Sequence, residues 1–232
     1  MRSGRSAALL LLILAAAAGC RHLAPPAPLP VDWQALVAEP RPFSALYRLS
    51  CCGHSGLVLG VRADGERLSL TVAVPPGGAA LAAWVGPDGG WVHRVKEGCR
   101  DPLPSGVLPI SATSSLPLDA RLAAMLLSGL LPAGAREVPQ APGWVEASTP
   151  GLRWQARVEG PQPHLTRLVV TRSGEETPML AADITESVGR VPAGLLITAG
   201  PEKAELVIQA WRAGDPPAPP PWLSAPVCGS GS

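Results

Sequence analysis

Apolar and polar side chains alternate along most of this chain. Every second residue is apolar from Phe43 to Cys51, and Leu68 to Val74 repeats the pattern. A period of two is typical of strands that bury one face. Turn residues such as Asp64-Gly65 separate the segments. Further apolar runs complete the set: Leu57 to Val61, Ala80 to Val85, Trp91 to Val95, Leu152 to Val158, Leu165 to Thr171, Met179 to Thr185, Leu195 to Thr198 and Leu206 to Trp211. We therefore predict a mainly β fold, an antiparallel half-open barrel of about ten strands.

One segment departs from this pattern and predicts a helix. Its apolar residues recur at helical spacing, at Leu118, Leu122, Met125, Leu126 and Leu130. Pro117 suits the first helical position, and Ser115 is a nearby candidate for the cap. Gly129 and Pro132 mark the end. We expect this helix to cover or plug the curved sheet.

The N-terminus carries the features of an export signal. Arg2 and Arg5 precede an apolar run that ends in Ala17-Ala18-Gly19-Cys20. The run is shorter than the roughly 20 residues that span a bilayer. A cysteine placed directly after small residues resembles a bacterial lipoprotein signal, which implies that Cys20 becomes the lipid-modified first residue. The alternative is an ordinary cleaved signal followed by a cysteine at that position.

These segments divide the chain into four parts. We predict a signal peptide over 1–19 and a lipidated, Pro-rich tether over 20–40. A single β-rich domain then covers 41–213, and a Pro/Gly-rich flexible tail covers 214–232.

Composition and motifs exclude several functions. Cleavage removes two of the 19 basic residues and none of the 18 acidic ones, so the mature chain is near neutral and gives no electrostatic case for nucleic-acid binding. Ser55 lies between glycines at Gly53-His54-Ser55-Gly56, but the strand-to-helix context of a serine nucleophile is missing. Dinucleotide and phosphate-loop motifs are absent. We expect no enzyme activity and no cofactor.

The cysteines outside the signal predict a disulfide. The bacterial periplasm is oxidising, so pairing is expected there. Neighbouring Cys51 and Cys52 point to opposite faces of a strand, so a bridge between them would be strained. Cys99 and this pair flank the first sheet segment, which favours a bridge from one of them to Cys99 and leaves Cys228, in the Pro/Gly tail, unpaired. The sequence alone does not choose among the connectivities. A zinc site of Cys51, Cys52, His54 and Cys99 is the less favoured reading, because structural sites space their first ligand pair by two to four residues.

Tryptophan is unusually frequent, with seven residues against one Phe and one Tyr. Ordinary core packing is one explanation, and a lined pocket is the other. A curved apolar sheet under an apolar helix would hold an acyl chain by burial, at about 0.8 kcal/mol per methylene. The residues predicted to line such a cavity are Leu70, Val72, Trp84, Trp91, Leu122, Leu126 and Trp154.

The order of motifs is similar to a known family. The runs Ser69 to Gly78, Ala120 to Pro132 and Leu206 to Trp211 resemble strand–loop–strand, helix and final-strand passages of the LolA/LolB lipoprotein-localisation superfamily. The resemblance implies an apolar cavity for lipoprotein acyl chains, and a lipidated member resembles the outer-membrane receptor branch. Arg21 after the lipidated cysteine is compatible with outer-membrane delivery facing the periplasm. We expect a monomer bound to the membrane through its lipid. The alternative is an envelope scaffold with a filled core and a protein partner.

Overall fold

The computed structural model describes residues 31–51, 53–76, 78–103, 108–109, 115–116, 119–149 and 151–229. The chain divides into two units, Met1–Pro30 and Val31–Ser232, and only the second contains described residues. The predicted signal peptide and the predicted lipidation at Cys20 therefore lie outside the described residues.

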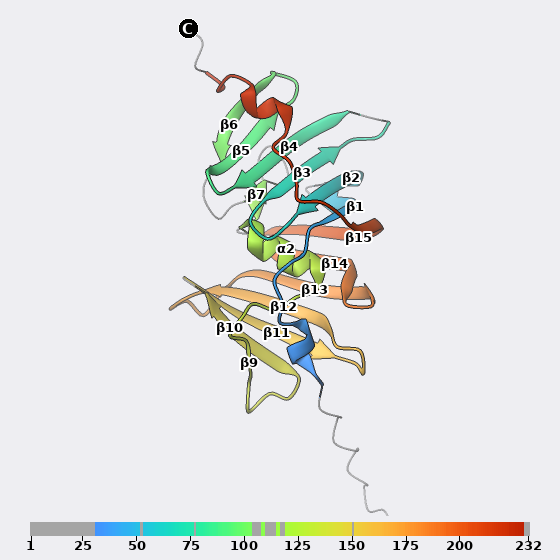
Figure 1. Cartoon of the computed structure of the whole chain (residues 1–232), viewed down its shortest axis with the longest axis vertical. Helices are drawn as coiled ribbons and strands as arrows, with labels where there is room; N and C mark the ends of the chain where they lie inside the picture. Colours follow the sequence, from blue (N-terminus) through green and yellow to red (C-terminus); the bar gives the residue numbers. More distant parts are fainter. Residues whose placement is uncertain are drawn as a thin grey trace, which may run out of the picture. The chain divides into compact units, whose positions relative to one another are not determined.

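One open antiparallel sheet of thirteen strands forms the described domain (Figure 1). Its first half contains β1 (Phe43–Cys51), β2 (His54–Ala63), β3 (Leu68–Ala73), β4 (Ala79–Gly86), β5 (Gly89–Arg94) and β6 (Cys99–Leu103). Its second half contains β9 (Arg136–Glu137), β10 (Trp144–Thr149), β11 (Leu152–Glu159), β12 (His164–Arg172), β13 (Pro178–Val188), β14 (Val191–Ala199) and β15 (Glu202–Ala213). The strand order runs from β6 back to β1, crosses to β15, and runs back from there to β9. The predicted mainly β, antiparallel fold is confirmed.

The sequence pattern missed three strands of the sheet, β6, β9 and β10. Strand β6 contains Pro102, which cannot donate to a sheet and is tolerated at an edge. Strand β9 is two residues long, and β10 begins with two apolar residues in succession, Trp144 and Val145, which breaks the alternation. A separate two-stranded ladder pairs β7 (Leu108–Pro109) with β8 (Ser115–Leu116).

The two faces of the sheet differ in polarity. Cross-strand partners share a face, so the pairing of Val61 with Ala45 and Leu70 places all three on one side. We call this side the inner face, because it carries the contiguous core. The positions between these residues, such as Ser44 and Arg62, belong to the outer face.

Helix α2 (Ala120–Ser128) belongs to this core and packs against β14. Its N-cap is Asp119, whose Oδ1 accepts the Leu122 N–H at 2.6 Å, so the predicted capping role of Ser115 is wrong. Gly129 closes the helix in the left-handed conformation, as predicted. A Cβ there would lie 1.8 Å from the Arg190 carbonyl oxygen, so only glycine fits between the helix end and β14. Every helical residue except Arg121 is buried, as expected of a helix that is apolar all round.

The end of the predicted tether joins the folded domain. Residues Trp33–Leu36 form the 3₁₀-helix η1, and Leu36 is buried in the core. The Leu36 carbonyl accepts the Leu131 N–H at 2.9 Å, and Val37 bridges Leu131. The domain therefore begins ahead of the predicted boundary at residue 41, because Leu36 is buried in the core and Trp33 and Val37 pack against it.

The predicted flexible tail is instead a strap against the sheet. We call residues 214–228 the C-terminal strap; it contains the 3₁₀-helix η2 (Pro221–Ser224). Figure 1 shows it, in red, running from β15 across β1 to β4 toward β6. The Trp222 ring stacks on His93 at 5.1 Å, and Val227 bridges Arg100 in parallel. Proline fixes φ before folding, so ordering this segment costs less entropy than ordering an ordinary chain.

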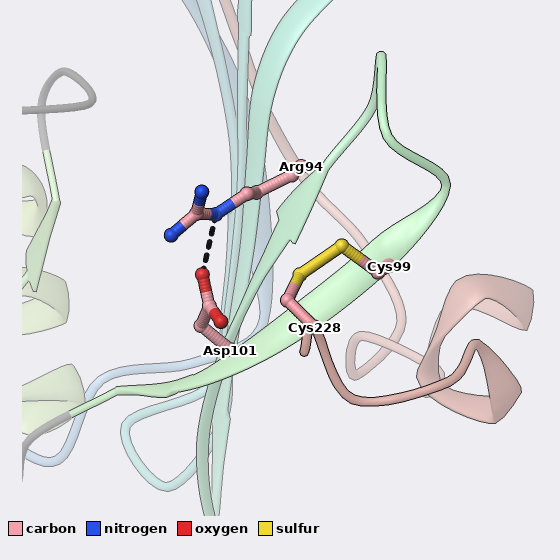
Figure 2. The surroundings of a disulfide bond; sticks show 4 residues. All are labelled: Arg94, Cys99, Asp101 and Cys228. Atoms are coloured by element: carbon pink, nitrogen blue, oxygen red, sulfur yellow. Dashed lines mark hydrogen bonds and ion pairs between the residues drawn. A yellow bond between two sulfur atoms is a disulfide. The ribbon is translucent and has the colours of Figure 1, made fainter. Parts of the chain in front are cut away.

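The disulfide joins Cys99 to Cys228, with a Cα–Cα distance of 5.1 Å (Figure 2). The predicted bridge from Cys99 to Cys51 or Cys52 is therefore wrong. The sheet order places Cys99 on β6, five strands from Cys51 on β1. Five strand spacings amount to about 24 Å, whereas a disulfide needs Cα atoms within about 7 Å. The same separation excludes a zinc site that combines Cys99 with Cys51 and His54.

Candidate functional site

The inner face brings together most of the predicted cavity residues. Leu70 and Val72 reach it from β3, Trp154 reaches it from β11, and Leu122 and Leu126 reach it from α2. These five side chains belong to one buried cluster. Alternation along the strands and helical spacing along the helix therefore predicted that these residues share one interior.

Trp84 and Trp91 lie on the outer face, and their predicted place in the cavity is corrected. Trp84 pairs with Ser69, which lies between Leu68 and Leu70 on β3 and so points away from the inner face. Trp91 lies directly opposite Trp84. The run Ala80 to Val85 is apolar throughout, so its pattern could not indicate which residues face inward.

Trp91 lies instead beside the residues that anchor the C-terminal strap. The Arg100 guanidinium lies 4.0 Å above the centre of the Trp91 ring, and His93, on the same face, stacks on Trp222. Trp84 is 6% exposed although it points away from the core. The strap therefore covers part of an outer patch whose side chains Trp91, His93 and Trp222 are half-buried.

Apart from Arg100 Nε on β6, three buried side-chain polar atoms have no hydrogen-bond partner among the described residues. They are the Tyr47 hydroxyl, the Ser128 hydroxyl and the Trp154 indole nitrogen. Tyr47 is fully buried, and desolvation raises its pKa far above the usual range, so the hydroxyl stays protonated and can donate. A buried polar atom without a partner costs about 1–3 kcal/mol. The inner face is therefore an apolar core that also encloses a few hydrogen-bonding groups.

Sequence reasoning found one of these three residues. Trp154 was predicted to line the cavity, whereas Tyr47 and Ser128 were not. The single tyrosine on an alternating strand was the available signal for Tyr47, because its alternation places the side chain inward. Ser128 gave no comparable signal, since a serine near a helix end is ordinarily solvated.

The described residues also bear on membranes and metals. Within the described ranges, no helix combines the length and hydropathy needed to cross a bilayer. In the same ranges, no three side chains of the His, Cys, Asp or Glu type gather as metal ligands.

Comparison with known proteins identifies no family. No family model matches the chain, and no curated protein matches it either. Among solved structures, the chain is similar to the β-barrel-like protein of domain of unknown function DUF1849 from Brucella abortus. That match has a TM-score of 0.32 and 10% sequence identity, and it covers 77% of this chain and 100% of the other.

Proposed function

We propose that this protein is a lipid-anchored bacterial envelope protein that holds acyl chains between the inner face of the sheet and α2. The observation that carries the proposal is an apolar interior that also buries unpartnered polar atoms at Tyr47, Ser128 and Trp154. Acyl chains gain about 0.8 kcal/mol per buried methylene from such walls. An ester or carboxyl group at the end of the chain gives one of these groups, the Tyr47 hydroxyl, an acceptor for its hydrogen bond.

The proposed ligand is the acyl group of a lipoprotein, and the proposed location is the outer membrane, facing the periplasm. The lipoprotein-type signal supports the anchor, with Cys20 as the attachment point. The disulfide between Cys99 and Cys228 supports an oxidising compartment. The Pro-rich run that follows Cys20 supports a tether between lipid and domain.

A second candidate function is an envelope scaffold with a filled core. The observation that favours it is the complete burial of large inner side chains, such as Leu122, Met125 and Leu126 on α2. When its side chains are packed in this way, α2 is part of the core and does not form the wall of a cavity. A scaffold would take its partner on an exposed surface and would bind no acyl chain.

A binding experiment separates the two candidates. The Cys20→Ser protein is expected to leave the membrane fraction and to provide a soluble form. This form is titrated with a fluorescent fatty acyl probe. In the acyl-chain proposal α2 forms one wall of the site. Leu126→Glu places a charge in that wall and is therefore expected to weaken binding of the probe at least tenfold. Leu196→Glu is the matched control, because Leu196 is 38% exposed on β14.

Folding is checked by thermal unfolding of each variant before titration. Saturable binding that Leu126→Glu weakens and Leu196→Glu leaves unchanged supports the acyl-chain proposal. A folded parent protein that binds no probe refutes it in favour of the scaffold. Retention of the Cys20→Ser protein in the membrane fraction would contradict the proposed lipid anchor at Cys20 but not the proposed acyl binding.

A further inference from the structure

A groove of about 710 Å³ lies on the outer face of the sheet, opposite the proposed acyl site. Its floor is made by β15, β1, β2 and β3, and one wall is the Ala218–Pro221 part of the C-terminal strap. Pro217, next to this wall, is buried, which fixes the start of the wall against the domain. The far end is held by the disulfide between Cys99 and Cys228. The groove is therefore a defined feature of the folded strap.

A row of polar side chains crosses the floor of this groove. Arg62 and Arg212 lie directly opposite Ser44, one on each side, and Ser69 continues the row beyond Arg62. Two strand spacings separate the two arginine backbones by about 10 Å, so both long side chains reach the space above Ser44. The Arg212 Nε donates to the Ser44 hydroxyl oxygen at 3.2 Å. Thr71, two residues after Ser69 on the same face of β3, adds a further hydroxyl to the groove.

The charge of the two arginines is not compensated within the groove. Among the described residues that line it there is no Asp or Glu. Neither Arg62 nor Arg212 forms an ion pair with a described residue. Of the twelve other arginines among the described residues, six pair with carboxylates: Arg94, Arg121, Arg136, Arg157, Arg167 and Arg172. The groove thus offers two unpaired guanidinium groups with hydroxyls between them, a combination that favours an anion.

We propose that this groove binds a phosphate-bearing ligand, with the phosphate above Ser44 and between Arg62 and Arg212. Two guanidinium groups approaching from opposite sides, together with a hydroxyl from below, require acceptor oxygens that point in several directions. A tetrahedral phosphate provides them, whereas the two oxygens of a carboxylate lie in one plane. The remainder of the ligand lies along the proline wall of the strap. The same chemistry fits a lipid headgroup and a soluble phosphate ester.

This proposal is independent of the acyl-chain proposal, because the groove and the inner face are on opposite sides of the sheet. The test uses the soluble Cys20→Ser protein, which is titrated with sn-glycerol 3-phosphate by calorimetry. A parallel series measures co-sedimentation with phosphatidylcholine vesicles that do or do not contain phosphatidylglycerol. The variant is the double substitution Arg62→Gln and Arg212→Gln. The matched control is Arg153→Gln, an exposed arginine on β11 with no ion pair to a described residue.

We expect the double variant to weaken binding at least tenfold, and Arg153→Gln to bind as the parent does. Both substitutions lie on exposed strand positions, so unfolding temperatures should change little. Saturable binding of glycerol phosphate identifies a soluble ester as the ligand class. Binding only to the vesicles with phosphatidylglycerol, again lost in the double variant, identifies a headgroup. Failure to bind either probe at millimolar concentration, or equal binding by parent and double variant, overturns the proposal.

Discussion

Replacing Tyr47 with phenylalanine removes one oxygen atom from the inner face and leaves the aromatic ring in place. In the structure that hydroxyl is fully buried and has no hydrogen-bond partner among the described residues. An unsatisfied buried polar group costs about 1–3 kcal/mol, so the substitution should stabilise the ligand-free protein by that amount. A domain of this size shifts its melting temperature by about 2–4 °C per kcal/mol, which predicts a rise of about 2–12 °C.

The same substitution should have the opposite effect on acyl binding. If the Tyr47 hydroxyl donates to the head of the ligand, its loss removes about 1 kcal/mol, which is about a fivefold rise in Kd. The assay pairs thermal unfolding of delipidated protein with titration of the acyl probe. A fall in the melting temperature of the ligand-free variant would refute the reasoning, because it would mean that the hydroxyl is already satisfied.

Alkaline titration tests the burial of Tyr47 independently. Burial raises the pKa of Tyr47 above its usual value near 10, because the apolar interior disfavours the phenolate. Because the pKa of Tyr47 is higher in the folded protein than in the unfolded chain, its contribution to stability is fully present below about pH 10. This contribution is lost as the pH rises beyond that value. The chain contains one tyrosine, so phenolate absorbance reports Tyr47 alone. It should develop together with unfolding; phenolate formation near pH 10 in the folded protein would contradict burial.

Two further predictions concern the strap and the helix. Cys228→Ser opens a bridge between residues 129 apart, for which the chain-entropy model gives about 5 kcal/mol; the melting temperature should fall, and limited proteolysis should cut after β15. An unchanged melting temperature and an uncut strap would count against its anchoring role. Asp119→Ala should destabilise the protein by about 1 kcal/mol through loss of the cap on α2, measured by denaturant unfolding, whereas Asp119→Asn should keep the cap. Equal losses in both variants would show that the cap bond contributes nothing.

Local patterns in the sequence predicted most of the elements of this fold. Alternation along segments such as Phe43 to Cys51 indicates strands, because a half-buried strand repeats every two residues. The helix end at Gly129 was also readable, since a left-handed C-cap selects glycine. Alternation along the strands, with helical spacing at Leu122 and Leu126, also predicted that Leu70, Val72 and Trp154 share one interior with the helix.

Tertiary structure decided which strands are neighbours and therefore what lies close together. The partner of Cys99 depends on sheet order, which puts Cys51 five strands away and brings the C-terminal strap to β6. Which face Trp84 occupies depends on its register with Ser69, a non-local pairing that an all-apolar run cannot encode. The row of Arg62, Ser44 and Arg212 likewise exists only because β2, β1 and β15 pair in that register.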